Sequence, residues 1–438
     1  MTGAAAVDEA LVARLRAAVA SELTARTTGS MLSVGRRLDR DDQAALAREL
    51  INQQLERYAQ ECLSAGRPVL TEAEEEALAT AVFDRIFNLG RLQPLLDDER
   101  VQEIIANGHD QVFLEYEDGT KQPGPPLAAS QAEFIELLRE IGRRYGLSER
   151  EFNPSHPSLN LQLPDGSRLF AVAWVCDRPC LAIRRHRLMK VTLADLQRLG
   201  SIDGNLRSFL SAAVRARKQI IIAGATGVGK TTMLRALASE IPPEERIVTI
   251  ETELELGLDR FPELHPDCVA LEAREANVEG VGAVTAADLV RMSLRMRPDR
   301  VIVGEVRGAE VIPMLNAMSQ GNEGSMCTVH ADSSATAFNK LALYAMQAPE
   351  RLPIEATALL ASAAIDLVVF STRRGSDRFV ASVRQVVGAD GPRLVTNELF
   401  APGPSGRAEQ AMPIPSDLLA DLAPLGYSQP GIRTGSLA

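Results

Sequence analysis

The sequence predicts a two-part α/β protein, in which a small α+β unit is followed by a larger unit built on a mostly parallel sheet. From about residue 205 to 400, runs of β-branched residues alternate with amphipathic helical segments, which is typical of a parallel sheet covered on both faces. Between residues 67 and 190, short strand-like and helix-like segments mix without that alternation. Over residues 1–66 apolar residues recur at helical spacing, which predicts a helical N-terminal region.

The α+β unit is defined by short periodic segments separated by turn signals. Asn107-Gly108 and the PDGS sequence at 164–167 are such signals. The expected elements are a helix over 72–88, a strand over 111–116, a helix over 131–144, and strands over 159–163, 168–175 and 180–186. We expect residues 191–204 to form a linker or hinge to the second unit.

The second unit should begin with a helix that leads into a buried strand. The expected elements are helix 206–217, strand 219–224, helix 231–241, strand 246–250, helix 286–297 and strand 300–305. The segments 365–371, 378–388 and 393–400 then predict a short antiparallel addition. Residues 401–438 contain six of the chain's 24 prolines and are expected to form a loose tail.

Composition excludes several classes of protein. The chain has 438 residues, 45% of them apolar and 24% charged, so it can build ordinary cores and is not a disordered protein. No apolar run reaches the roughly 18 residues of a membrane span; the nearest, residues 356–370, contains Asp366. The N-terminus alternates charged and apolar residues, unlike a secretory signal.

The charge and cysteine content favour a reduced, cytosolic protein that does not coat nucleic acid. The formal net charge is −11, which argues against nucleic-acid coating as the main task. Five cysteines form no framework, and Cys176 and Cys180 have no second pair with which to complete a zinc site.

The strongest motif is a complete GxxxxGK[ST] phosphate-binding loop between a buried strand and an amphipathic helix. Its residues, with the threonine that follows, are Gly224, Ala225, Thr226, Gly227, Val228, Gly229, Lys230, Thr231 and Thr232. The glycines let backbone N–H groups turn inward towards a polyphosphate, and the helix adds the positive end of its dipole. Lys230 would reach the β- and γ-phosphates of ATP, while the Thr231 hydroxyl would bind Mg²⁺.

Two acidic clusters follow predicted strands, at the edge where open α/β sheets bind ligands. Glu251, Glu253 and Glu255 follow the strand 246–250, and Glu305 ends the strand 300–305. We interpret Glu255 as the base that positions water and Glu305 as the acid on the metal side; the two roles could be exchanged. Gly304 stands where an aspartate usually ends such a strand.

Arginines are frequent between the two acidic clusters and beyond them. They are Arg274, Arg291, Arg295, Arg297, Arg300 and Arg307. One or two of them would serve as fingers across a subunit boundary, and the remainder as surface ion pairs. In the first unit, Arg168 and Arg184 would close over the phosphates. His330, near Ser325 and Thr328, would sense the γ-phosphate.

These landmarks together resemble the secretion ATPase superfamily, the motors of type II and type IV secretion and of type IV pili. The resemblance is carried over about residues 75–400 by GATGVGKTT, RIVTIETELEL, LVRMSLRMRPDRVIVGEVRG and GSMCTVHADS, and in the first unit by LGRLQPLLDDERVQEIIANG and LPDGSRLFA. The most similar branch is CpaF, the motor of Tad/Flp pili. The resemblance implies a PAS-like N-terminal domain, a RecA-like C-terminal domain, a ring of six chains and ATP bound between the two domains.

Carried over residue by residue, the resemblance gives each motif a role. Lys230 and Thr231 take the Walker A roles. Glu251 and Glu255 fall in the family's Asp box, with Glu255 on its catalytic glutamate. Glu305 falls in an atypical Walker B strand and binds the metal together with Thr231 and Glu251. His330 falls on the His box, and Arg274 and Arg297 lie in stretches that contribute charge at subunit contacts.

Two positions depart from the family pattern. Thr252 follows Glu251 where an aspartate is usual, and Asn322 replaces an earlier histidine. Both departures affect the surroundings of the metal and the coupling of nucleotide to motion, so we expect an active but slow ATPase.

The resemblance further implies how such a motor works. ATP binding would draw the two domains together, hydrolysis would reopen them, and inner-membrane platform proteins would carry the motion to a pilus or a secreted substrate. The protein would be cytoplasmic and held at the membrane face through these partners. Three alternatives remain: a type IV secretion ATPase for DNA or effector transfer, a nucleic-acid motor, and a weakly hydrolysing nucleotide-dependent scaffold.

Overall fold

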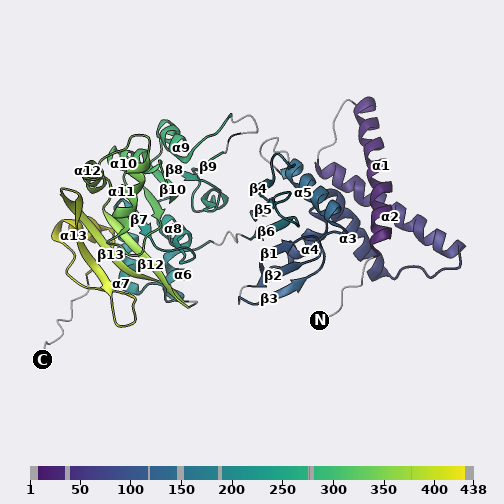
Figure 1. Cartoon of the computed structure of the whole chain (residues 1–438). Coiled ribbons are helices and arrows are strands. Elements are labelled where there is room, and N and C mark those ends of the chain that lie inside the picture. Colours follow the sequence, from purple (N-terminus) through teal and green to yellow (C-terminus); the bar gives the residue numbers. More distant parts are fainter. Residues whose placement is uncertain are drawn as a thin grey trace. The chain divides into compact units, whose positions relative to one another are not determined.

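The computed structural model describes residues 8–34, 40–116, 119–145, 152–185, 190–274, 276, 281–375 and 377–429. The chain divides into two compact units, Met1–Arg187 and Leu188–Ala438, each of which is described by itself (Figure 1). Both units combine helices with a sheet, which confirms the predicted mixed α/β fold class.

The first unit contains three long helices followed by an antiparallel sheet. Its elements are α1 (Glu9–Val34), α2 (Arg40–Ser64), α3 (Glu72–Phe87), α4 (Gln93–Asp97), β1 (Val101–Asn107), β2 (Val112–Tyr116), β3 (Lys121–Gly124), α5 (Gln131–Tyr145), β4 (Ser158–Gln162), β5 (Arg168–Val172) and β6 (Cys180–Arg184). The strand order is β3-β2-β1-β6-β5-β4. Alternate strand residues such as Ile104, Leu169 and Ile183 are buried in one core with Phe134 and Leu138 of α5, so α5 covers one face of this sheet.

Helices α1–α3 form a separate apolar cluster. Val12 and Val19 of α1, Leu50 of α2 and Val82 of α3 are fully buried in it. Thr71 caps α3 through a reciprocal capping box with Glu74, which fixes where that helix begins. The helical character predicted for residues 1–66 is seen in α1 and α2, which pack on each other and on α3.

The second unit is built on a nine-stranded sheet. Its elements are α6 (Leu193–Arg198), α7 (Gly204–Arg215), β7 (Ile220–Ala223), α8 (Lys230–Ala238), β8 (Ile247–Glu251), β9 (Cys268–Glu272), α9 (Ala286–Ser293), β10 (Arg300–Val306), α10 (Val311–Ser319), β11 (Met326–Val329), α11 (Ala337–Gln347), α12 (Ile354–Ala364), β12 (Leu367–Arg374), β13 (Asp377–Asp390), β14 (Arg393–Pro402), β15 (Ala408–Gln410) and α13 (Ser416–Leu422). The strand order is β15-β14-β13-β12-β7-β11-β10-β8-β9.

Helices cover both faces of this sheet (Figure 1). Ile220 and Ile222 of β7 belong to the core formed with α6, α7 and α8, whereas Ile221 and Ala223 belong to the core on the face of α9–α12. Because successive side chains of a strand point to opposite faces, a continuous apolar run is what a doubly covered strand needs. The parallel arrangement of β7, β8, β10 and β11 brings their carboxyl ends to one edge of the sheet.

Three expectations from the sequence differ from the structure. Strand β12 pairs parallel with β7, and the antiparallel addition begins only at β13. The expected linker 191–204 instead packs into the second unit, since Leu193 and Leu196 of α6 are buried there. The expected loose tail is ordered to residue 429: Leu422 and Tyr427 are buried, and the Tyr427 ring lies 5.5 Å from that of Phe209. In the expected linker and in the expected tail, burial of the apolar residues holds the segment against the second unit in spite of its turn-forming residues. Residues 430–438 lie outside the described part.

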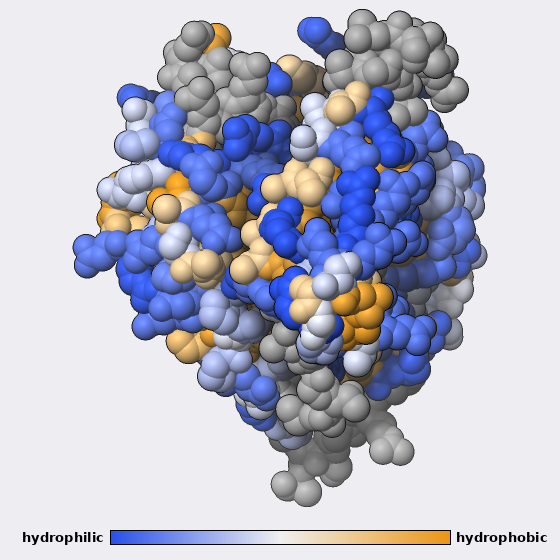
Figure 2. Space-filling model, turned by 90° about the vertical axis from the view of Figure 1, so that its right-hand side faces the viewer, coloured by the Kyte–Doolittle hydropathy of each residue, from blue (hydrophilic) through white to orange (hydrophobic). Residues whose placement is uncertain are grey.

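Figure 2 shows one face of the molecule as mostly hydrophilic, with apolar residues in small separate patches. None of the described helices combines the length and the apolar composition that crossing a bilayer requires.

A buried ion pair joins the start of β10 to the loop before β8. The Arg300 side chain is completely buried, and its guanidinium donates to both carboxylate oxygens of Glu245 at 2.8 and 3.0 Å. Its remaining nitrogen donates to the carbonyls of Val214 and Gly324. The cation is therefore fully hydrogen-bonded although no solvent reaches it.

Replacing Glu245 with alanine should leave this buried cation uncompensated. We expect the free energy of unfolding to fall by about 3–5 kcal/mol. The neighbouring carboxylate Glu244 is exposed, so Glu244→Ala serves as the matched control and should change stability by less than about 0.5 kcal/mol. Calorimetry of both variants measures the difference; equal effects would contradict a role for the buried pair.

Candidate nucleotide-binding site

The phosphate-binding loop joins the carboxyl end of β7 to the N-terminus of α8. Gly229 has a left-handed backbone (φ 90°) and immediately precedes α8, which begins at Lys230. Strands β11 and β12 flank β7 on its two sides, so the loop lies at the middle of the sheet edge. Backbone N–H groups at a helix N-terminus together with the helix dipole favour an anion at this place.

Gly224 is required because the backbone of β12 passes directly beside it. A β-carbon at this position would lie 2.5 Å from the carbonyl oxygen of Ser371 and 2.7 Å from a methyl group of Val228. No side chain is compatible with such a contact, so the start of the loop is packed against the neighbouring strand.

Lys230 is buried at the centre of the site. Its side chain is 8% exposed, and Nζ donates to the carbonyl of Ala225 at 3.0 Å. Nζ also lies 3.5 Å from Nε2 of His330 and 3.9 Å from Oε1 of Glu305. Burial lowers the pKa of Lys230, and the charge of Glu305 acts in the opposite direction. An anion in the loop would compensate this desolvated cation.

Glu305, near the end of β10, connects Lys230 to His330. Its Oε1 lies 2.6 Å from Nε2 of His330, which follows β11, and its other oxygen pairs with Arg307. This separation is that of a hydrogen bond between the imidazole and the carboxyl group. Burial and the nearby Lys230 lower the pKa of His330, which favours the neutral imidazole. The structure thus brings Lys230, Glu305 and His330 together, as the sequence predicts.

Glu251, at the end of β8, is buried and fully engaged. Its side chain is 3% exposed, and Oε2 accepts from the backbone N–H groups of Glu255 and Leu256 at 2.7 and 2.8 Å. Its Oε1 accepts from the hydroxyl of Thr249 at 3.2 Å. Burial raises the pKa of Glu251 to about 7, although the two backbone hydrogen bonds act in the opposite direction.

The structure explains why glycine occupies position 304. A β-carbon there would lie 3.0 Å from Cγ of Glu251, on the neighbouring strand. The Glu251 side chain therefore occupies the space that any side chain at position 304 would need.

The segment that carries Glu255 is held from two sides. Glu251 accepts from its backbone N–H groups, while Arg235 of α8 donates to the carbonyls of Glu255 and Leu256. Glu255 itself is half-buried, and its charge acts on Lys230. Sequence reasoning missed Arg235; its position one turn beyond Thr231 on the helix after the loop is the signal that could have found it.

The four predicted arginines lie in different places. Arg274 follows β9 and donates to the carbonyl of Gly282 at 2.9 Å. Arg297 precedes β10, whereas Glu305 lies near the other end of that strand. The length of strand from Arg300 to Glu305 is about 16 Å. Arg168 and Arg184 are register neighbours on β5 and β6 of the first unit. The roles of Arg168 and Arg184 at the phosphates and of Arg274 and Arg297 at subunit contacts stay predictions.

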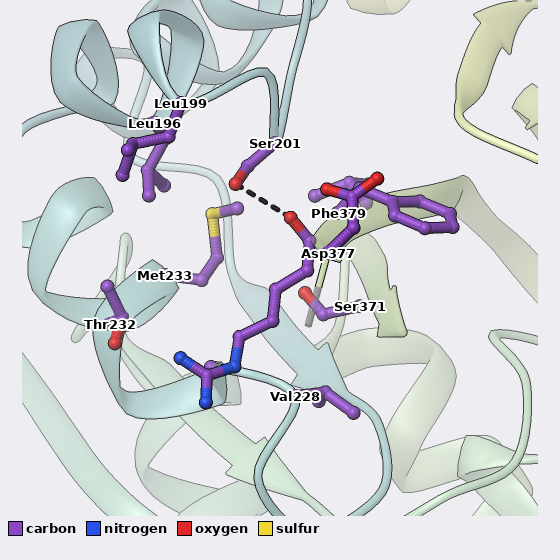
Figure 3. A pocket seen from close by; sticks show the side chains of 12 residues that line it. Leu196, Leu199, Ser201, Val228, Thr232, Met233, Ser371, Asp377 and Phe379 are labelled. Carbon is purple, nitrogen blue, oxygen red and sulfur yellow. Dashed lines mark hydrogen bonds between the residues drawn. The ribbon is translucent and has the colours of Figure 1, made fainter. Parts of the chain in front are cut away.

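A pocket beside the loop was not predicted from the sequence (Figure 3). Its volume is about 270 Å³. The lining residues are Leu196, Leu199, Ser201, Val228, Gly229, Thr232, Met233, Ser371, Asp377, Arg378, Phe379 and Val380. The dashed line in Figure 3 is the 2.8 Å hydrogen bond from Ser201 Oγ to the carbonyl of Arg378. These residues come from the expected linker, the loop, α8 and strands β12 and β13, so no single local sequence motif predicts the pocket.

Comparisons with known proteins agree with this architecture. Residues 88–374 match the family of type II/IV secretion system proteins. A putative conjugal transfer protein of Mycobacterium tuberculosis (strain ATCC 25618 / H37Rv) is 36% identical over 313 residues, which cover 68% of this chain and 85% of that protein. The type IV secretion system protein PtlH of Bordetella pertussis is 33% identical over 313 residues, covering 66% and 90% of the two chains.

A solved structure shares the fold. The ATPase DotB of Legionella pneumophila superposes with a TM-score of 0.51 at 19% identity, covering 68% of this chain and 79% of that one.

The raised pKa of Glu251 predicts a specific pH dependence. An acid whose pKa is about 7 when folded and about 4.5 when unfolded binds more protons in the folded chain between these values, so stability falls as pH rises through that range. We expect Glu251→Gln to flatten this fall, measured by urea unfolding at several pH values. Glu355→Gln, at an exposed carboxylate, is the control. An identical pH profile for wild type and Glu251→Gln would disprove the assignment.

Proposed function

This chain belongs to the family of type II/IV secretion system proteins, and from that premise we propose that it binds ATP at the loop 224–231 and hydrolyses it to drive a type IV secretion or pilus machine. The proposal rests on one observation above all: a desolvated lysine at the start of α8 lies within 4 Å of Glu305 and His330 at the carboxyl edge of a parallel sheet. A bound triphosphate would compensate the buried cation.

The loop and the neighbouring pocket suit the two ends of a nucleotide. The N-terminus of α8 and Lys230 would hold the phosphates. The pocket begins at Gly229 and Thr232, and Leu196, Met233 and Phe379 give it apolar walls, as a planar base requires. Ribose would then lie between the two.

Magnesium would be held by Thr231 and Glu305. Thr231 is the last residue of the loop motif, and Glu305 faces Lys230 at the same edge of the sheet. When bound, Mg²⁺ neutralises charge that develops on the phosphate oxygens. Both oxygens of Glu251 already accept hydrogen bonds, and those of Glu305 contact His330 and Arg307. Metal binding by either carboxylate would require these contacts to rearrange and stays a prediction from the sequence.

Glu255 would position the attacking water, and its surroundings support this role. Glu251 and Arg235 fix the backbone of its segment. A neutral His330 bonded to Glu305 would report the presence of the γ-phosphate to the end of β11. Arg274 and Arg297 would act from a neighbouring subunit in a ring of six chains.

The machine that the ATPase serves is a separate question. The relatives are named for conjugal transfer and type IV secretion, which favours a type IV secretion machine. The role in Tad pili, with inner-membrane platform proteins as partners, stays a prediction. Genes for a pilin and two platform proteins beside this one would favour it, whereas genes for transfer proteins would favour secretion.

Paired variants test the site. Lys230→Ala should weaken ATP binding at least about 10-fold, because a buried charge-assisted contact is lost. Glu255→Gln should bind ATP normally and lose at least about 100-fold of its hydrolysis rate. Isothermal calorimetry and phosphate release measure the two effects. A Lys230→Ala protein with unchanged affinity would refute the site, and equal slow hydrolysis by wild type and Glu255→Gln would favour a nucleotide-dependent scaffold.

A second measurement distinguishes motor types. We expect ATP hydrolysis to rise when membrane fractions that contain the platform proteins are added, and to be unaffected by single-stranded DNA. Stimulation by DNA with no response to membranes would instead favour a nucleic-acid motor on the same fold.

A further inference from the structure

Two arginines on the neighbouring strands β12 and β13 lie directly beside the phosphate loop. Arg373 is near the end of β12, and Arg378 is near the start of β13. A β-carbon on Gly227 would lie 3.7 Å from Nη1 of Arg373, and one on Gly229 would lie 3.7 Å from Cδ of Arg378. Both side chains therefore border the loop from within the same chain.

The pairing register places these two cations opposite each other. Arg373 and Arg378 are direct partners across the antiparallel β12–β13 pair. Like charges at such positions repel and destabilise the pair of strands. The adjacent pair is different, because Arg374 lies opposite Asp377. The repulsion is thus confined to the two residues that touch the loop.

No carboxylate within the described part of the chain forms an ion pair with either guanidinium. Both arginines are exposed, whereas Asp377, the acidic residue between them in sequence, pairs with Arg407 at 2.6 Å. An anion placed over the loop would remove the repulsion, since a guanidinium binds phosphate through two parallel N–H donors.

The strands that carry the two arginines are fixed to their surroundings. The carbonyl of Ser371 packs on Gly224. The hydroxyl of Ser201 donates to the carbonyl of Arg378, and the backbone carbonyl of Ser201 accepts from the N–H of Val380 at 3.0 Å. These contacts hold the backbone on both sides of the two guanidinium groups, so the phosphate contacts would be largely preorganised.

We propose that Arg373 and Arg378 form a clamp, supplied by the same subunit, that binds the phosphates of the nucleotide held by the loop 224–231. The inference rests on the proposed nucleotide site and adds two binding residues from strands β12 and β13, which no phosphate-loop motif includes. The clamp contacts phosphate, so its contribution grows with the number of phosphates on the ligand.

The test compares Arg373→Ala and Arg378→Ala with Arg374→Ala as the matched control. Arg374 is the neighbouring exposed arginine on β12, outside the clamp. Calorimetry with ATP, ADP and adenosine gives the affinities of the full chain. We expect each clamp variant to weaken ATP binding about 10-fold or more and ADP binding less. Adenosine binding should be unchanged in Arg373→Ala and should change far less than ATP binding in Arg378→Ala, since Arg378 also lines the pocket assigned to the base. Arg→Lys at either position should restore part of the loss.

Thermal unfolding distinguishes a binding role from a structural one. Because each substitution removes a repulsive pair, the clamp variants should be at least as stable as wild type. Unchanged ATP affinity in both variants, with Lys230→Ala still defective, would overturn the clamp and leave the nucleotide site intact. Equal losses for ATP and adenosine would also overturn it. A wild-type chain that binds no ATP would remove the proposed function itself.

Discussion

The buried carboxylate of Glu251 is the contact on which the geometry of the site depends. It ends β8, lies across Gly304 of β10 and accepts the backbone N–H groups that begin the segment of Glu255. A single side chain thus limits which residue fits at position 304 of β10 and holds the path of the chain after β8. Placing a carboxylate where only 3% of it is exposed is costly, and the three hydrogen bonds that it accepts offset that cost.

This arrangement accounts for the unusual end of β10. With Glu251 from the neighbouring strand occupying the space beside position 304, the acid of β10 moves one residue further, to Glu305. At this position, in a stretch where the β10–β11 register shifts between Val303 and Val306, the carboxylate contacts Lys230 and His330. The glycine at position 304 and the acid at position 305 are therefore both explained by the place of Glu251 on the neighbouring strand.

The sequence predicted the parts of the fold and of the site that depend on local signals. The apolar run of β7, the loop and the start of α8 follow from glycine, β-branched and amphipathic patterns. Local patterns did not reveal β9, which is half-buried at the end of the parallel part, or the parallel pairing of β12. They also could not place Asn322. Its side-chain amide donates to the carbonyl of Ala317, and it precedes the amino end of β11, whereas His330 follows the carboxyl end. Pairing between distant strands decides the first two.

The net charge of the chain does not reveal how charges are distributed around the site. The chain carries a formal net charge of −11, yet Lys230, Arg307, Arg373 and Arg378 come from four separate elements to one edge of the sheet. At roughly 8–10 Å of screening length in physiological salt, distant surface carboxylates contribute little to the potential there. A bound anion would meet the buried Lys230 and the opposed Arg373 and Arg378, so it would offset both the desolvation of the lysine and the repulsion between the two arginines. The total charge therefore says little about which ligand this edge selects, whereas the pairing register of β12 and β13 says a great deal.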